Sequence, residues 1–306
     1  MAFALKTDES AAKGVKRLVR KQIESAVESL TKQAGAKQEE AVHDARKRFK
    51  KVRALLRLVR PELGEKVYKR ENACFRDAAR PLSEVRDARV LVEALDGLAE
   101  RSGGNGKSLG PVRKALQARQ RATRRRVLKE EQSPARIAEA AEEARQRVKD
   151  WDIGRKGWAA LGTGLKRVYK SGRDAFAAAR VEPSVEALHE WRKQVKYLWH
   201  QLQVLGPTWP GLMDEMGKQA HQLADHLGDD HDLAVLRDLL VQEGSQWARP
   251  GTVTKLLGLI DERRGELQHD AAQLGQRLYA DRPKAFLNRL HSYWQAWRAD
   301  GNGAVG

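Results

Sequence analysis

Two short segments place histidine, arginine and lysine at the spacing of one helical face. They are His43-Asp-Ala-Arg46-Lys47-Arg-Phe-Lys50 and His189-Glu-Trp-Arg192-Lys193-Gln-Val-Lys196, so both follow the pattern H-x-x-R-K-x-x-K. Residues three, four and seven positions apart lie on the same side of an α-helix. Arg can bind two oxygens of one phosphate, Lys supplies a compact positive charge, and His can donate a hydrogen bond. Each segment therefore predicts a line of anion-binding side chains.

The first stripe is longer than the second. It continues through Arg53 and Arg57, whereas Trp199 and Gln203 stand at the equivalent places of the second. Like charges four positions apart destabilise a helix by a few tenths of a kcal/mol per pair, and Asp44 is the single acid in residues 43–60. A bound anion would remove that penalty. A helical turn advances about 5.4 Å, so the cations favour a linear ligand.

Further basic residues recur at helical spacing on neighbouring segments. The basic residues within residues 72–86 form a second predicted face, and their counterparts in the second half include His221 and His231. The basic residues within residues 13–20 form a third predicted face. The basic run from Arg113 to Lys129 is expected to be a solvated outer face. The predicted anion-binding residues are Lys13, Arg17, Arg20, His43, Arg46, Lys47, Lys50, Arg53, Arg57, Arg76, Arg80, Arg86, His189, Arg192, Lys193, Lys196 and His231.

The overall charge also favours a polyanionic partner. Lys and Arg total 58 against 41 Asp and Glu, which gives a net charge of +17. Such a field attracts polyanions without selecting one of them. The single cysteine, Cys74, excludes a disulfide within the chain, and the sequence has neither an apolar signal segment nor a run of the roughly 18 apolar residues that spans a membrane. A cytoplasmic protein is expected.

Nearly the whole chain is predicted to be helical, because proline is rare and no β-branched alternation occurs. The first helix is expected after a cap at residues 7–8, and a break is expected near Pro81. Residues 101–110 are predicted to be a loop and residues 299–306 a frayed tail. The first predicted helix ends near residue 32. The others are predicted to span about residues 38–60, 64–98, 111–131, 133–149, 158–180, 183–205, 210–227, 230–242, 252–279 and 283–298.

The two H-x-x-R-K-x-x-K segments belong to a longer repeat. They are 146 residues apart, and a second match, residues 82–91 with residues 227–236, follows at an offset of 145. Two matches in the same order indicate an internal duplication. We expect an all-α fold of two antiparallel helical bundles related by a pseudo-twofold axis, residues 1–150 and 151–306, with the seam near residues 150–157.

The chain resembles the CHAD proteins, named for a conserved histidine α-helical domain. The resemblance rests on Val42-His43-x-x-Arg46-Lys47-x-x-Lys50-Lys51-x-Arg53-x-x-x-Arg57, Leu188-His189-Glu190-Trp191-Arg192-Lys193-x-x-Lys196, Glu71-Asn72, Arg76-Asp77, Arg86-Asp87 and Leu223-Ala224-Asp225-x-Leu227-Gly228-Asp229-Asp230-His231-Asp232-Leu233. It implies two helical bundles that bind inorganic polyphosphate and a location on polyphosphate granules. It implies that His43, Arg46, Lys50, Arg53, Arg57, His189, Arg192 and Lys196 face the polyanion. No cofactor is expected, and nothing resembles the triphosphate-tunnel enzyme domain that some members carry.

A metal-dependent phosphohydrolase is the enzymatic alternative. His231-Asp232 is an HD pair, and the other possible ligands nearby are His221, Asp225, His226, Asp229 and Asp230. In the first half Asp87 matches Asp232, but Arg86 replaces the histidine. A metal ligand is not expected to be replaced by arginine, so these acids are predicted to orient basic side chains or to cap a helix near Asp229. We therefore expect neither a metal site nor an enzyme.

Non-specific binding of RNA or DNA is the second alternative, and the charge permits it. No helix-turn-helix, zinc finger or base-stacking platform is evident. The tryptophans Trp191, Trp199, Trp294 and Trp297 lie at helical spacing and are expected to pack. A membrane-surface role is disfavoured, because the basic helices are expected to be committed to a core. The residues predict a linear polyanion as the partner. The family resemblance implies that this polyanion is polyphosphate, with weak nucleic-acid binding as the alternative.

Overall fold

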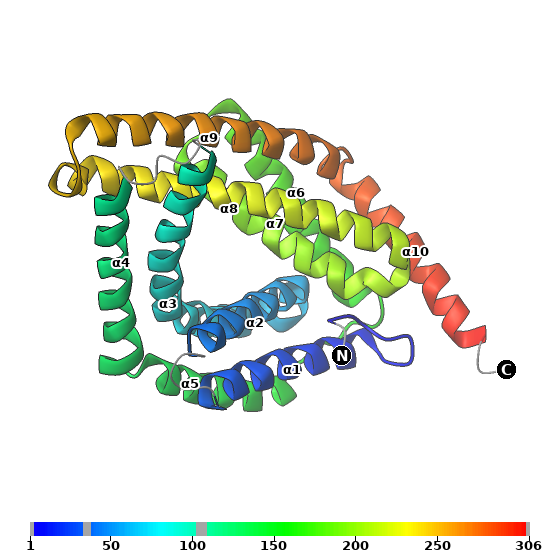
Figure 1. Cartoon of the computed structure of the whole chain (residues 1–306). Helices are drawn as coiled ribbons and strands as arrows, with labels where there is room; N and C mark the ends of the chain where they lie inside the picture. Colours follow the sequence, from blue (N-terminus) through cyan, green and yellow to red (C-terminus); the bar gives the residue numbers. More distant parts are fainter. Residues whose placement is uncertain (1–2, 33–37, 102–108, 304–306) are drawn as a thin grey trace.

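The computed structural model describes residues 3–32, 38–101 and 109–303, the last three by their backbone alone, and the described chain is all-α without a strand (Figure 1). This confirms the predicted fold class. The helices are α1 (Ala11–Lys32), α2 (Gln38–Leu58), α3 (Arg60–Arg101), α4 (Gly110–Arg125), α5 (Ser133–Arg147), α6 (Ala159–Val181), α7 (Val185–Leu205), α8 (Pro210–Trp247), α9 (Pro250–Leu278) and α10 (Pro283–Gly303). Short helical turns occur at η3 (Arg126–Glu130), η4 (Val148–Asp150) and η5 (Gly206–Thr208).

Helices α1 and α7 begin at serine caps. The cap of α1 is Ser10, whose Oγ accepts a hydrogen bond from the backbone N–H of Lys13 at 3.2 Å, so the expected cap at residues 7–8 is wrong. Ser184 caps α7 in the same way through the N–H of Ala187, also at 3.2 Å. A side-chain oxygen bound to the third helical N–H satisfies one of the unpaired donors of the first turn.

Two expected breaks are absent. Helix α3 continues through Pro81, and α8 runs without interruption past Gly228, although helix ends were predicted near Leu227 and Asp230. In α8 the buried positions keep their spacing across this point, and Asp230 is itself buried and accepts hydrogen bonds from α9. The continuous buried face outweighs the local preference of glycine and aspartate for a helix end.

Other helix boundaries and links lie near their predicted positions. Gly64 adopts φ 70°, which kinks α3 one turn after its start, and only glycine does so at little cost. Residues 151–157 form an irregular link before α6, at the expected seam. Most of the predicted loop, residues 102–108, lies outside the described residues. The predicted tail is wrong in part, because α10 continues to Gly303.

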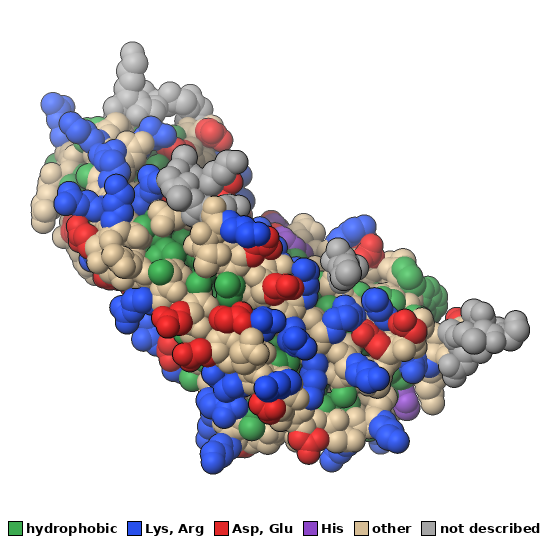
Figure 2. Space-filling model, turned by 90° about the horizontal axis from the view of Figure 1, so that it is seen from below, with side chains coloured by type: hydrophobic (Ala, Val, Ile, Leu, Met, Phe, Trp, Pro, Cys, Tyr) green, Lys and Arg blue, Asp and Glu red, His purple; other side chains and the backbone are tan. Residues whose placement is uncertain are grey.

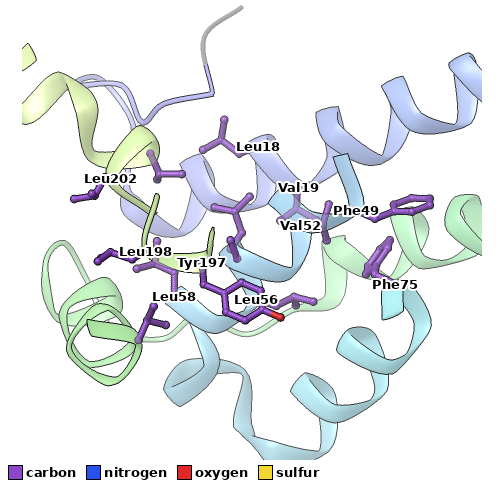
Figure 3. Packing of buried hydrophobic residues seen from close by; sticks show 14 of the residues in the cluster. Leu18, Val19, Phe49, Val52, Leu56, Leu58, Phe75, Tyr197, Leu198 and Leu202 are labelled. Atoms are coloured by element: carbon purple, nitrogen blue, oxygen red, sulfur yellow. The ribbon is translucent and has the colours of Figure 1, made fainter. Parts of the chain in front are cut away.

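Both halves of the chain contribute to the main hydrophobic core (Figure 3). In the close-up, Leu58 and Leu56 of α2 lie beside Leu198 and Tyr197 of α7, and Val52 of α2 lies beside Val19 of α1. The Nε2 of Gln201 donates to the carbonyl of Ala54 at 3.1 Å inside this contact. Helices α2 and α7, which carry the two cationic segments, are therefore packed against each other.

A second core lies at the other end of α3 and α8, where these helices meet α4 and α9. Figure 1 shows α8 and α9 side by side along one edge and α1 and α5 along the opposite edge. The order of the helices is compatible with a duplication, but the pseudo-twofold relation and the division at residue 150 stay predictions. In the described part of the chain, no helix is long and apolar enough to cross a bilayer.

Candidate anion-binding site

Cationic side chains of α2 and α7 meet where these helices pack together. The buried faces of the two helices recur at three- and four-residue steps, through Phe49 and Val52 on α2 and through Trp191 and Val195 on α7. This packing turns Arg46 and Lys50 toward α7, so that the charge of Arg192 acts on both of them and Lys196 acts on Lys50.

Helix α3 adds a fifth cation, Arg86, whose charge acts on Arg46, Lys50, Arg192 and Lys196. Its Nη1 donates to both carboxylate oxygens of Asp232 on α8, at 3.2 and 3.1 Å. The structure thus gathers residues that are up to 150 positions apart in the chain. We call the set Arg46, Lys50, Arg86, Arg192 and Lys196 the central cluster.

Several hydrogen-bonding nitrogens of this region lack a partner. The Nε atoms of Arg46 and Arg192 and the Nδ1 atoms of His189 and His231 are buried and have no hydrogen-bond partner among the described residues. Arg46 is only 8% exposed. A buried polar group without a partner costs about 1–3 kcal/mol, and more when it is charged. These nitrogens therefore have hydrogen-bonding capacity that no group of the described structure uses.

Burial changes the protonation of the two lysines in the central cluster. Burial, followed by the charge of Arg192, lowers the pKa of Lys196 to about 7. Burial and the charge of Lys196 lower the pKa of Lys50 well below its usual range. Burial also lowers the pKa of Arg46 to about 10, against the attraction of Asp87. A bound anion would stabilise the charged lysines and raise these pKa values.

The histidines lie around this cluster. The rings of His189 and His231 are 4.7 Å apart between centroids. Burial and the neighbouring His231 lower the pKa of His189 to about 4, and burial and Arg192 lower the pKa of His231. His43 is exposed, and burial and Lys47 lower its pKa. These rings are neutral hydrogen-bonding groups at neutral pH.

Gly228 of α8 gives Arg192 its place. A Cβ atom built on Gly228 would lie 2.8 Å from Nη2 of Arg192, closer than the two atoms can approach. The guanidinium therefore lies directly against the backbone of α8, in space that any other residue would fill. Gly228 belongs to the motif of residues 223–233, and no pattern in the sequence predicts its contact with Arg192.

The outer part of the first stripe is engaged in contacts within the fold. Arg53 Nε and Arg57 Nη1 donate to the Oδ1 of Asn72 at 3.1 and 2.9 Å. The Arg57 guanidinium lies 3.8 Å from the ring centroid of Tyr197 on α7. This arginine therefore joins three helices, and its cation–π contact accounts for its position without a ligand.

The second stripe diverges at the matching place. Trp199 packs between the rings of His200 and His221, at centroid distances of 4.5 and 4.0 Å. It lines a separate cavity of about 900 Å³ together with Lys51 and the start of α8. Trp199 is therefore a packing residue, and the second stripe enters the central cluster through Arg192 and Lys196.

The other predicted residues lie outside the central cluster, and their role in binding stays a prediction. Arg76 and Arg80 pair with Asp77 at 3.0 and 2.8 Å. Arg17 binds Glu9 at 2.5 Å and the carbonyl of Ala4 at 3.0 Å, which ties down the N-terminal segment. The remaining members are exposed on their helices, with Lys193 paired to Glu190: Lys13, Arg20, Lys47 and Lys193.

Two basic residues near the site are absent from the predicted set. A cavity of about 300 Å³ beside Arg86 is also lined by Arg101 at the end of α3 and Arg263 of α9, together with Asp229 and Asp232. No local pattern marks these arginines, because the long pairing of α8 with α9 brings Arg263 to this place.

The acids of the HD segment are engaged with basic groups. Asp230 accepts from Arg264 at 3.0 Å, Asp232 from Arg86, and Asp225 lies 2.5 Å from His221. Among the residues that the structure describes, no three His, Cys, Asp or Glu side chains are grouped so that they could hold a metal. The prediction that these acids orient basic side chains agrees with the contacts, whereas a helix cap at Asp229 is wrong because α8 is continuous.

One comparison with known proteins gives a match. A sequence model of the CHAD domain family matches residues 17–241, which is more than half of the chain and includes both cationic segments. A search of curated proteins gives no match.

Proposed function

Because the chain belongs to the CHAD domain family, we propose that it binds inorganic polyphosphate at the central cluster. The observation that carries this proposal is the set of buried donors without acceptors, above all Nε of Arg46 and Nε of Arg192. They come from two helices that cross inside the core, so the fold holds them together before any ligand arrives. Phosphate oxygens are the strong acceptors that suit such guanidinium groups.

A linear phosphate chain suits the layout of the cations. Lys50 and Lys196 lie one helical turn beyond Arg46 and Arg192 on their respective helices, and Arg86 continues the cluster toward the cavity beside α9. Successive phosphates of one chain would satisfy these groups in turn. A double-stranded nucleic acid presents its phosphates on a wide, rigid surface, which fits buried donors poorly.

We propose a binding role without catalysis. The acids near the cluster are bound to Arg86, Arg264 and His221, where they fix side-chain positions. Incubation with long-chain polyphosphate, with and without Mg²⁺, is expected to leave the chain length unchanged on a gel. Release of orthophosphate or stepwise shortening would contradict this part of the proposal.

Binding to polyphosphate would place the protein on polyphosphate granules, as the family resemblance implies. A fluorescent fusion is expected to collect on granules and to disperse when Arg46 and Arg192 are both replaced by alanine. Granule association that survives this double substitution would require another contact.

Calorimetric titration tests the proposed function. Long-chain polyphosphate and single-stranded RNA are titrated in parallel at about 0.15 M salt, where interactions between exposed charges are largely screened beyond about 8 Å. We expect polyphosphate to bind much more tightly than RNA. Similar weak binding of both ligands would indicate a general cationic surface and favour the nucleic-acid alternative.

A further inference from the structure

Two carboxylates stand among the cations of the central cluster. Asp87 and Asp232 occupy the same position in the two sequence segments that repeat at an offset of 145, where Arg86 matches His231. Asp232 Oδ2 lies 3.1 Å from Arg86 Nη1, and Asp87 Oδ1 lies 3.9 Å from Arg46 Nη2. Each acid therefore faces an arginine that a phosphate is expected to bind.

These acids do not serve as helix caps. Asp87 lies inside α3 and Asp232 lies inside α8, and both helices continue on either side. The charge of Asp232 acts on Arg46, Arg192 and Lys196, and the charge of Asp87 acts on Arg46 and Arg192. Together with the hydrogen bonds from Arg86 to Asp232, their influence reaches Arg46, Arg86, Arg192 and Lys196 of the cluster.

Carboxylates at these positions oppose a polyanion in two ways. Asp232 accepts hydrogen bonds from Arg86, and Asp87 attracts Arg46 from 3.9 Å, so a phosphate must replace these acids or share their arginines. They also repel the negative charge of any ligand that enters. A site built for anion affinity alone would lack both groups.

We propose that Asp87 and Asp232 are resident competitors that set which anions the central cluster accepts. The inference rests on the proposed function, since it concerns the selectivity of the same site. A polycarboxylate such as an acidic protein segment replaces one carboxylate by another and gains little from the exchange. A phosphate chain carries a higher charge density and offers more acceptor oxygens, so it displaces the resident acids.

The test uses substitutions that keep the shape and remove the charge. Asp232→Asn and Asp87→Asn are compared with Asp96→Asn, a control on α3 whose carboxylate pairs with Arg113 of α4 at 2.7 Å, outside the cluster. Each variant is titrated with long-chain polyphosphate and with polyglutamate, in buffer containing a metal chelator. Thermal unfolding of each variant shows whether the fold is retained.

We expect Asp232→Asn to bind both polymers about five- to tenfold more tightly, because one repelling charge has left the site. Asp87→Asn is expected to have a smaller effect in the same direction, since its side chain is 60% exposed. Polyglutamate, which the wild-type chain is expected to bind hardly at all, should bind measurably to the double variant. Asp96→Asn should match the wild type.

Weaker binding by a folded Asp232→Asn variant would overturn the inference, because the acid would then be holding Arg86 in its binding position. Unchanged affinity for both polymers would overturn it as well. A parallel titration with Mg²⁺ in place of the chelator tests for a shared cation. Tighter wild-type binding in Mg²⁺ that is lost in Asp232→Asn would overturn the inference, because the acid would then hold a cation that the phosphate also binds. If neither the wild type nor any variant binds polyphosphate, the proposed function falls together with the inference; tight wild-type binding with no gain in the variants would refute the inference alone.

Discussion

The arginines of α4 and those of the central cluster are the same kind of residue in opposite circumstances. On α4, Arg113 pairs with Asp96 at 2.7 Å, Arg119 with Glu243 at 3.1 Å and Arg124 with Glu39 at 2.9 Å, all at the surface. In the central cluster, Arg46 is buried and Arg192 is partly buried, and each has an Nε without an acceptor in the described structure.

This difference shows that the density of basic residues is a poor guide to an anion site. The sequence of α4 is at least as basic as that of α7, and the face drawn in Figure 2 carries many Lys and Arg side chains interspersed with acids. Exposed ion pairs contribute little and are screened by salt. What marks the central cluster is burial with unsatisfied hydrogen-bonding capacity.

The largest effect is expected from removing two members of the cluster. Arg46→Ala combined with Lys50→Ala should weaken polyphosphate binding by about 3 kcal/mol or more, because hydrogen bonds to charged groups contribute roughly 1.5–3 kcal/mol each. Titration calorimetry measures the change. The matched pair Arg124→Ala with Arg125→Ala, on α4, should change binding much less. Equal losses in the two double variants would mean that diffuse charge, and not the cluster, binds the ligand.

A smaller effect is expected from pH, through the proton on Lys196. Its pKa is about 7 without ligand, and an anion favours the charged form, so affinity is full below this pKa and falls as pH rises through it. Between pH 6 and pH 8 the affinity should fall about tenfold if only the charged lysine binds. The groups whose charges act at this place are Lys50, Arg86, Arg192, Asp225 and Asp232.

Lys196→Arg provides the control for this pH dependence, since arginine stays charged throughout the range. The variant should bind with a flatter profile between pH 6 and pH 8. The variant should also take up fewer protons on binding than the wild type, as measured by calorimetry in buffers of different ionisation enthalpy. An unchanged profile in the variant would show that another group takes up the proton.

Gly228→Ala should weaken binding severalfold while leaving the fold intact. The added Cβ would meet the end of the flexible Arg192 side chain, which can move away but then leaves its binding position. Gly217→Ala on the same helix is the control, because its Cβ would meet nothing within 4 Å. The control should raise stability by up to about 1 kcal/mol, as alanine replaces a helical glycine. Equal binding by the two variants would remove the role assigned to Gly228.

The smallest effect on binding is expected at Arg57, although the sequence places it in the same stripe as Arg46. Arg57→Ala should lower the free energy of unfolding by about 1–2 kcal/mol, because it loses the contact with Tyr197 and the hydrogen bond to Asn72. Polyphosphate affinity should change little. Chemical denaturation and titration together separate the two effects, and a large loss of affinity without loss of stability would put Arg57 in the binding site.

The sequence predicts the helices well where one face repeats without a competing signal. It does so for α2 and α7, whose buried positions recur at three- and four-residue steps. It fails at Gly228 and Pro81, where residues that often end a helix are overruled by packing on both sides. The cap at Ser10 was missed because residues 7–8 offer the same chemistry slightly earlier in the chain.

The sequence predicts the types of residue that form the site. It does not predict which of the basic residues in a stripe belong to the site. Spacing alone brings Arg46, Lys50, Arg53 and Arg57 to one stripe, but it does not tell which of them meets α7 at the cluster and which packs on Tyr197. The acids are a similar case, since the link between Arg86 and Asp232 joins residues 146 positions apart. Such contacts depend on how the helices cross.

A structure of the protein crystallised with a short linear polyphosphate tests the central claim most directly. The account predicts phosphate oxygens about 3 Å from Nε of Arg46 and Nε of Arg192, with Lys50 and Lys196 on neighbouring phosphates. Phosphates ordered along the exposed arginines of α4, with the central cluster unchanged, would contradict it.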